Sequence, residues 1–216
     1  MSPQPRISSS AVAGSSLADI AETIAAKLGL PHLSVSYIKI GDVQEAQGDL
    51  TGAMRSYREG LAIRERLAKS DPGNSDWQRD LSVSYIKIGD VVAQGDLTGA
   101  MRSYREGLAI RDRLAKSDPG NAGWQRDLSV AYMRIGDVQL AQGDLAGAQK
   151  SHRDSLAIFD RLANSDRGNA GWQRDLSVSF EKVGDVQPRR RDEAPRAIDE
   201  ETLREIAASY MFFFME

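Results

Sequence analysis

Few side chains in this sequence of 216 residues are suited to covalent or metal chemistry. There is no cysteine, which excludes disulfides, thiolate nucleophiles and cysteine-bound metals. The two histidines, His32 and His152, are 120 positions apart and lie in no metal-binding or catalytic motif. The glycines fit neither a phosphate-binding loop nor a dinucleotide fingerprint, and no pair of carboxylates has a spacing that identifies a pocket. The sequence therefore favours a protein that is not an enzyme and uses no cofactor or metal.

The composition is that of an ordinary, slightly acidic globular protein. Hydrophobic residues make up 41% of the chain, and 28 Lys and Arg face 31 Asp and Glu. This balance argues against nucleic acid as a partner. No stretch approaches the roughly 18–20 apolar residues of a membrane span, and residues 1–15 lack the core of a signal peptide. We expect a cytoplasmic protein that binds neither nucleic acid nor a membrane.

A repeated segment organises the chain. LSVSYIKIGDV at Leu33 recurs at Leu81, then as LSVAYMRIGDV at Leu128 and LSVSFEKVGDV at Leu176, with offsets of 48, 47 and 48 residues. Once Gln44 is set aside as an extra residue, the first two units are identical at 43 of 47 positions. Such a period indicates a repeat array. The expected units are repeat 1 at 33–80, repeat 2 at 81–127, repeat 3 at 128–175 and a partial repeat 4 at 176–187.

Each unit has the pattern of two helices. In repeat 2, apolar residues recur every three or four positions from Trp77 to Val92, and again from Leu97 to Leu114, with Gln-Gly-Asp between the two stripes. A Pro-Gly loop ends the second stripe. The prediction is an all-α fold, a right-handed α-solenoid of antiparallel helix pairs. Repeat 2 lacks one residue before Gly95, so we expect its first helix to end early or its turn to be tighter.

The units resemble a long-period variant of the tetratricopeptide repeat. In the first unit the Leu-Gly, turn glycine, small residue and aromatic of that family are matched by Ile40-Gly41, Gly48, Ala53 and Tyr57. The same positions recur in the next two units, with His152 in the aromatic position of the third. The resemblance covers residues 33–187, although the usual period is about 34 residues. It implies a superhelix whose first helices line a concave face that binds a partner's peptide or helix.

The resemblance also assigns the residues of that face, which alternate between apolar and acidic. We expect it to favour a protein partner that carries apolar anchors beside Lys or Arg. The acidic residues argue against the family subclass that clamps the carboxylate of chaperone tails. The assigned residues are Val35, Ile38, Asp42, Glu45, Val83, Ile86, Asp90, Val130, Met133, Asp137, Leu140, Val178, Glu181 and Asp185.

An alternative reading gives the acidic residues a purely local role. Each aspartate of the face follows a basic residue by three positions, and exposed pairs on one helix contribute only a few tenths of a kcal/mol, about 0.2–0.5. In this reading each aspartate is neutralised on its own helix. The basic residues concerned are Lys39, Lys87, Arg134 and Lys182.

Both ends of the chain depart from the repeat. Residues 16–30 are predicted to form an N-terminal capping helix after a disordered segment at 1–15, because solenoid ends need covering. Residues 188–216 are predicted to form a divergent linker and a C-terminal apolar helix that replaces the second helix of repeat 4. The apolar stripes are Leu17, Ile20, Ala21, Ile24 and Leu28 in the first helix, and Leu203, Ile206, Ala207, Tyr210 and Phe214 in the second.

Three functions remain open from the sequence. The first is a non-catalytic scaffold for protein–protein interaction. The second is a structural or self-associating module, with a possible homo-oligomer formed through the C-terminal helix. The third is the truncated sensor or adaptor part of a larger repeat protein. The tail from Met211 to Met215 fits a native cap, a docking helix or an altered reading frame equally well.

Overall fold

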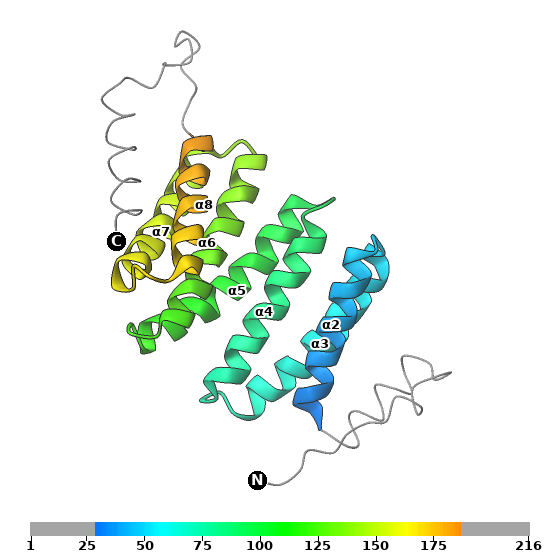
Figure 1. The fold of residues 1–216 in the computed structure, drawn as a ribbon. Helices are drawn as coiled ribbons and strands as arrows, with labels where there is room; N and C mark the ends of the chain where they lie inside the picture. The colour runs from blue at the N-terminus through cyan, green and yellow to red at the C-terminus, as the bar shows by residue number, and fades with distance from the viewer. Residues whose placement is uncertain (1–28, 187–216) are drawn as a thin grey trace, which may run out of the picture. The chain divides into compact units, whose positions relative to one another are not determined.

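The computed structural model describes residues 29–186, which form an array of α-helices (Figure 1). The predicted segments 1–15 and 188–216 lie outside this range, as do Gln187 and residues 16–28 of the capping helix predicted at 16–30. The last two residues of that prediction are instead the cap and the first residue of α2. None of the helices described within 29–186 is long and apolar enough to cross a membrane. The helices are α2 (Leu30–Ala46), α3 (Leu50–Ser70), α4 (Ser75–Val92), α5 (Leu97–Ser117), α6 (Ala122–Ala141), α7 (Leu145–Ser165) and α8 (Ala170–Val186).

The helices follow one another as pairs. Turns of three or four residues join α2 to α3, α4 to α5 and α6 to α7, and loops of four residues join each pair to the next. Consecutive pairs lie side by side in Figure 1. The predicted all-α solenoid of helix pairs is therefore confirmed. The second helix of each pair has 21 residues, which accounts for the long repeat period.

Polar residues at fixed positions of the repeat begin the helices. The aspartate of Gln-Gly-Asp caps each second helix, and its side chain accepts a hydrogen bond from the backbone N–H three residues later. The asparagine of the loop caps α4, α6 and α8 in the same way. These residues are Asp49, Asp96 and Asp144, and Asn74, Asn121 and Asn169.

The missing residue of repeat 2 changes the turn after α4. In repeat 1, Gly48 has a φ of 79° and the Asp49 N–H bonds to the Gln44 carbonyl at 2.9 Å, which closes a Schellman turn. In repeat 2, α4 ends at Val92, one aligned position earlier than α2, and Gly95 is not among the glycines with positive φ. The expectation that this helix ends early is confirmed. One more residue lies between the two helices than in repeat 1, and the Asp96 N–H bonds to the Val92 carbonyl, four residues earlier instead of five.

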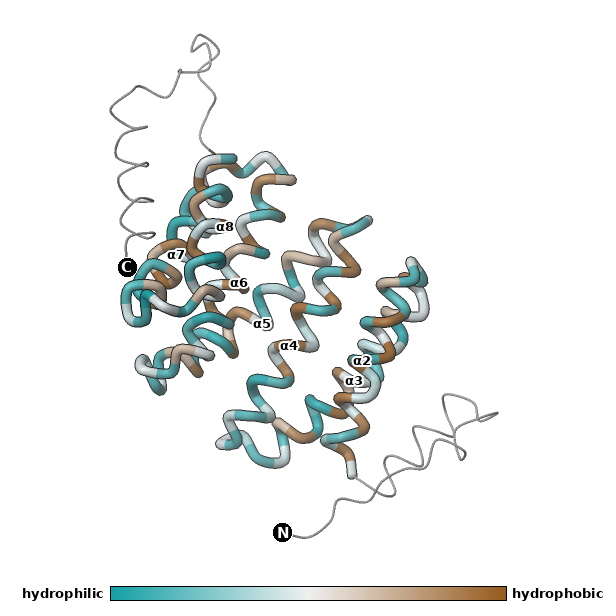
Figure 2. The backbone as a smooth tube through the Cα atoms, viewed as in Figure 1, coloured by the Kyte–Doolittle hydropathy of each residue, from teal (hydrophilic) through white to brown (hydrophobic). Residues whose placement is uncertain are grey.

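Small residues let the helices of a pair approach closely. A Cβ on Gly41 would lie 2.4 Å from the Tyr57 ring, and one on Gly89 would lie 2.4 Å from the Tyr104 ring. In the third pair the ring of His152 takes that place beside Gly136. Figure 2 shows hydrophobic positions alternating with hydrophilic ones along the helices. The glycine and the aromatic therefore fix how the first and second helices cross.

Buried arginines join neighbouring pairs. The Arg64 side chain is almost fully buried in α3 and donates to Ser34 Oγ, to the Asp80 carbonyl and to Ser84 Oγ, so it ties its own pair to α4. Arg111 of α5 likewise ties its own pair to α6, because it donates to Ser82 Oγ and, at 2.8 Å, to the Asp127 carbonyl. Burial lowers the pKa of both guanidinium groups.

Candidate functional site

Asp42 is the centre of the first of three similar clusters on the face of the first helices. Its Oδ1 lies 2.8 Å from the Lys87 Nζ of α4 and 2.8 Å from the Tyr57 hydroxyl of α3. The same hydroxyl lies 2.8 Å from Glu45 Oε2, so it can donate its proton to either carboxylate. Burial and the two acceptors raise the pKa of the Tyr57 phenol. Three helices of two successive repeats thus meet at one aspartate.

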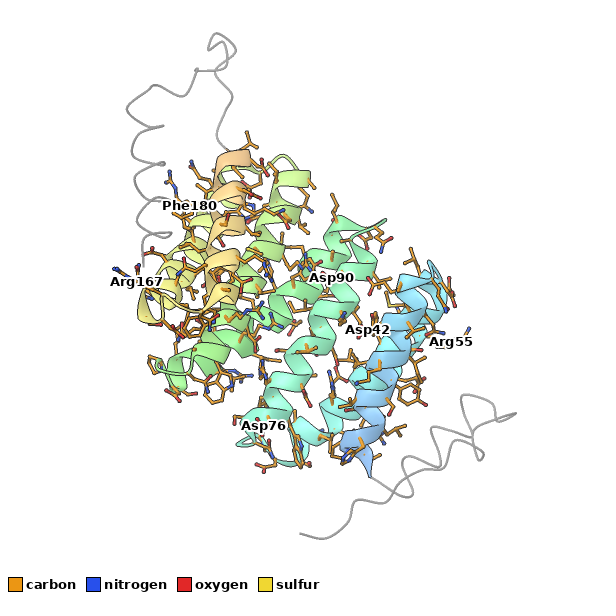
Figure 3. The ribbon with its side chains drawn as sticks, viewed as in Figure 1. Asp42, Arg55, Asp76, Asp90, Arg167 and Phe180 are labelled. Carbon is orange, nitrogen blue, oxygen red and sulfur yellow. The ribbon has the colours of Figure 1, made fainter. Side chains whose placement is uncertain are left out.

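Asp90 repeats this arrangement one unit further along. The Tyr104 hydroxyl of α5 donates to Asp90 Oδ1 at 2.7 Å, and Arg134 Nε of α6 lies 3.1 Å from the same oxygen. Burial, followed by the charge of Asp90, raises the pKa of the Tyr104 phenol. Asp42 and Asp90 lie on neighbouring first helices in Figure 3.

Asp137 is the centre of the third cluster, in which His152 takes the position that a tyrosine holds in the other two. Lys182 of α8 lies 2.8 Å from Asp137 Oδ1. His152 Nε2 lies 3.7 Å from the same oxygen, beyond hydrogen-bonding distance, and neither ring nitrogen has a hydrogen-bond partner within residues 29–186. Burial lowers the pKa of His152, and the nearby Asp137 carboxylate opposes this effect. We call these three clusters the ladder, comprising Asp42, Tyr57 and Lys87, then Asp90, Tyr104 and Arg134, then Asp137, His152 and Lys182.

The ladder corrects the pairing expected from sequence. Each aspartate pairs with a base on the first helix of the next repeat, not with the base three positions earlier on its own helix. Across residues 29–186 no ion pair forms for Lys39 at the start of the ladder or for Asp185 at its end. A second series joins the same helices nearer their N-termini, with Arg79 bonded to Asp127 and Arg126 to Asp175.

The predicted binding residues divide by burial. Ile38 and Ile86 are 7% and 6% exposed and pack against the glycines of their own second helices, so they belong to the core and not to an apolar surface. Glu181 takes the equivalent place in α8 and is exposed. Val35 and Asp185 are also exposed. The half-buried residues are Asp42, Glu45, Val83, Asp90, Val130, Met133, Asp137, Leu140 and Val178.

A pocket of about 350 Å³ gathers three of the predicted residues: Glu45, Asp90 and Asp137. It spans three repeats and opens beside the lengthened turn of repeat 2. Ala93, Leu97 and Val138 supply apolar walls, and Tyr104 and Arg134 complete the lining. Its carboxylates are not equivalent. Asp90 and Asp137 already have cationic partners, whereas Glu45 has no such partner within the described residues.

Sequence reasoning missed the partners that cross between repeats. Tyr57 and Tyr104 are buried in the core, yet their hydroxyls reach the acidic face. The signal was a nearly constant spacing, since each ladder aspartate precedes a tyrosine or histidine by 14 or 15 positions.

Within residues 29–186 no group of three or more His, Asp or Glu side chains is placed to hold a metal ion. The site therefore presents charged groups, hydroxyls and apolar walls.

Comparisons with known proteins agree with this architecture. The family model of the tetratricopeptide repeat matches residues 33–72. No curated protein matches the sequence. The chain is similar in structure to BtubC from P. vanneervenii, with a TM-score of 0.53 and 17% identity, covering 84% of this chain and 66% of that one. The chain thus spans just under two thirds of that protein.

Two other solved structures align less well. One is the Sgt2 TPR domain from Aspergillus fumigatus, at 16% identity and a TM-score of 0.39, covering 78% of this chain and 92% of that one. The other is the first TPR of Spaghetti bound to an HSP90 peptide, at 15% identity and a TM-score of 0.36, covering 70% and 93%. At these TM-scores neither alignment bears on the site.

The match to residues 33–72 covers the first helix pair, α2 and α3. The second pair has nearly the same sequence, and the third keeps the same glycine at the crossing of its helices. Residues 33–72 thus match the tetratricopeptide repeat, and the following helix pairs repeat the same pattern.

Proposed function

We propose that this protein is a non-catalytic interaction scaffold, and that the pocket at Glu45 is the centre of its binding face. The partner is a peptide or helix of another protein that carries a Lys or Arg next to apolar side chains. The observation that supports this is the Glu45 carboxylate, which has no cationic partner within residues 29–186, beside the apolar walls of Ala93 and Leu97.

The charges around the pocket favour a single cation. Arg134 neutralises Asp90, and Lys182 neutralises Asp137, so Glu45 supplies the net negative charge. A long basic side chain suits such a site, because its alkyl stem covers apolar surface while its head group meets the carboxylate. The ladder itself serves a different purpose: it ties each repeat to the next.

The test uses labelled 12-residue peptides with one Arg flanked by Leu, and fluorescence anisotropy. Glu45→Gln removes the charge but retains an acceptor for the Tyr57 hydroxyl, and Ala93→Arg places a competing cation in the pocket. We expect both variants to weaken binding by at least about tenfold, or 1.4 kcal/mol. The matched control, Glu106→Gln on the exposed side of α5, leaves binding unchanged.

Two results would contradict this proposal. One is equal affinity of wild type, both pocket variants and the control. The other is no binding of any Arg–Leu peptide by wild type, or affinity that survives the replacement of the peptide's Arg by Glu. Light scattering on the same samples separates peptide binding from self-association.

A further inference from the structure

One face of α2 is open where the same face of every other first helix is covered. Val43 is 57% exposed, while its equivalents Val91, Val138 and Val186 are 7%, 4% and 4% exposed. A pocket of about 440 Å³, lined by Tyr37, Ile40 and residues of α3, adjoins this face. An apolar position that is buried in three repeats and exposed in the fourth indicates a surface that another segment covers.

The structure shows what kind of surface covers this face. Val91 and Ile88 of α4 pack in one cluster with Tyr57 and Ala53 of α3, and partly buried residues of the same helix adjoin them. The face of α6 meets α5 in the same way. The covering residues are Leu50, Ala53, Met54, Tyr57 and Leu61 in α3, and Leu97, Ala100, Met101, Tyr104 and Leu108 in α5.

The sequence just before α2 has the same spacing of apolar residues. The covering residues of α3 follow the pattern 0, 3, 4, 7 and 11, counted from Leu50, and those of α5 follow it from Leu97. Counted from Leu17, the same pattern selects Ile20, Ala21, Ile24 and Leu28. We propose that residues 16–28 pack as a helix on the open face of α2 and cover Val43, as the preceding second helix does in the later repeats.

Length and connection suit this placement. A helix of 13 residues is about 20 Å long, which is also the distance along α2 from Leu30 to Val43. Gly29, the single linking residue, has a φ of 83°, which permits a sharp reversal of the chain. An antiparallel arrangement sets Leu28 beside the start of α2 and Leu17 beside Val43.

Disulfide formation between introduced cysteines tests the proposal, because the natural chain contains none. The variant Leu17→Cys, Val43→Cys places two thiols on the facing sides. A disulfide needs Cα atoms about 4.4–6.8 Å apart, so it reports close approach. In the control, Asp19→Cys, Val43→Cys, the first cysteine lies on the opposite side of the helical stripe. Circular dichroism checks that both variants are folded.

We expect rapid formation of a disulfide within one chain in the Leu17 variant and little in the Asp19 control, seen as a mobility change on non-reducing gels. Disulfides between chains in the Leu17 variant would overturn the proposal in favour of a second copy on this face. Equal reaction of both variants, or no reaction in either, would also overturn it. None of these outcomes depends on peptide binding at Glu45.

Discussion

Lys87 Nζ lies 2.8 Å from Asp42 Oδ1, on the first helix of the preceding repeat. The ammonium group is also 5.9 Å from the centre of the Tyr57 ring. One lysine therefore contacts both helices of the neighbouring pair. Because solenoid stability is set largely by the interfaces between neighbours, this contact acts where the array is held together.

A double-mutant cycle between Asp42→Asn and Lys87→Met measures that contact. Both side chains are partly exposed, so we expect a coupling energy of about 0.5–1 kcal/mol in urea unfolding. The matched cycle between Asp42→Asn and Lys39→Met tests pairing on one helix, and its coupling should be near zero. A larger coupling with Lys39 would contradict the ladder.

The buried Arg111 should matter far more than an exposed arginine of the same helix. Arg111→Ala leaves the Asp127 carbonyl and Ser82 Oγ without their donor, so we expect unfolding to become easier by about 2–4 kcal/mol. Arg113→Ala, at an exposed position of α5, should change stability by less than about 0.5 kcal/mol. Similar losses for the two variants in chemical denaturation would refute this role for Arg111.

The altered turn of repeat 2 predicts different responses from two aligned glycines. Gly48→Ala forces a side chain into a left-handed conformation with a φ of 79°, and should cost about 1–2 kcal/mol. Gly95→Ala should cost less than about 0.5 kcal/mol, because that φ is not positive. Neither position has atoms that would obstruct the new Cβ, so thermal unfolding isolates the backbone effect. Equal costs would show that the two turns have the same conformation.

His152 should make stability depend on pH. Burial lowers its pKa in the folded protein below the ordinary value of 6.5, so the unfolded chain takes up a proton that the folded one resists. Stability is therefore greatest above pH 6.5 and falls as the pH drops from 6.5 towards the lower folded pKa. The thermal midpoint measured across this range should show the decline.

His152→Tyr should flatten that decline and add about 1 kcal/mol, because the new hydroxyl can donate to Asp137 as Tyr104 does to Asp90. A slope that survives unchanged in the His152 variant would contradict this role for His152.

Much of the fold could be predicted from the repeat itself. The offsets of 47 and 48 residues and the two apolar stripes locate both helices of each pair, because side-chain periodicity on a helix is a local property. The early end of α4 also follows from one missing residue. The sequence did not predict the partners of the aspartates. Each aspartate has a basic residue three positions earlier on its own helix, and this spacing suggests a pair on one helix whichever residues the neighbouring helix presents.

The sequence by itself determined the helices, their caps and their order, through residues that act on their near neighbours, such as Asn74 and Asp96. Only the tertiary structure decided that Lys87 pairs with Asp42, that Arg64 and Arg111 are buried, and that Ile38 and Ile86 belong to the core. The physical reason is that these outcomes depend on which face of one helix meets the next. The packing of whole repeats determines which faces meet, and it therefore determines both which side chains are buried and which charges pair.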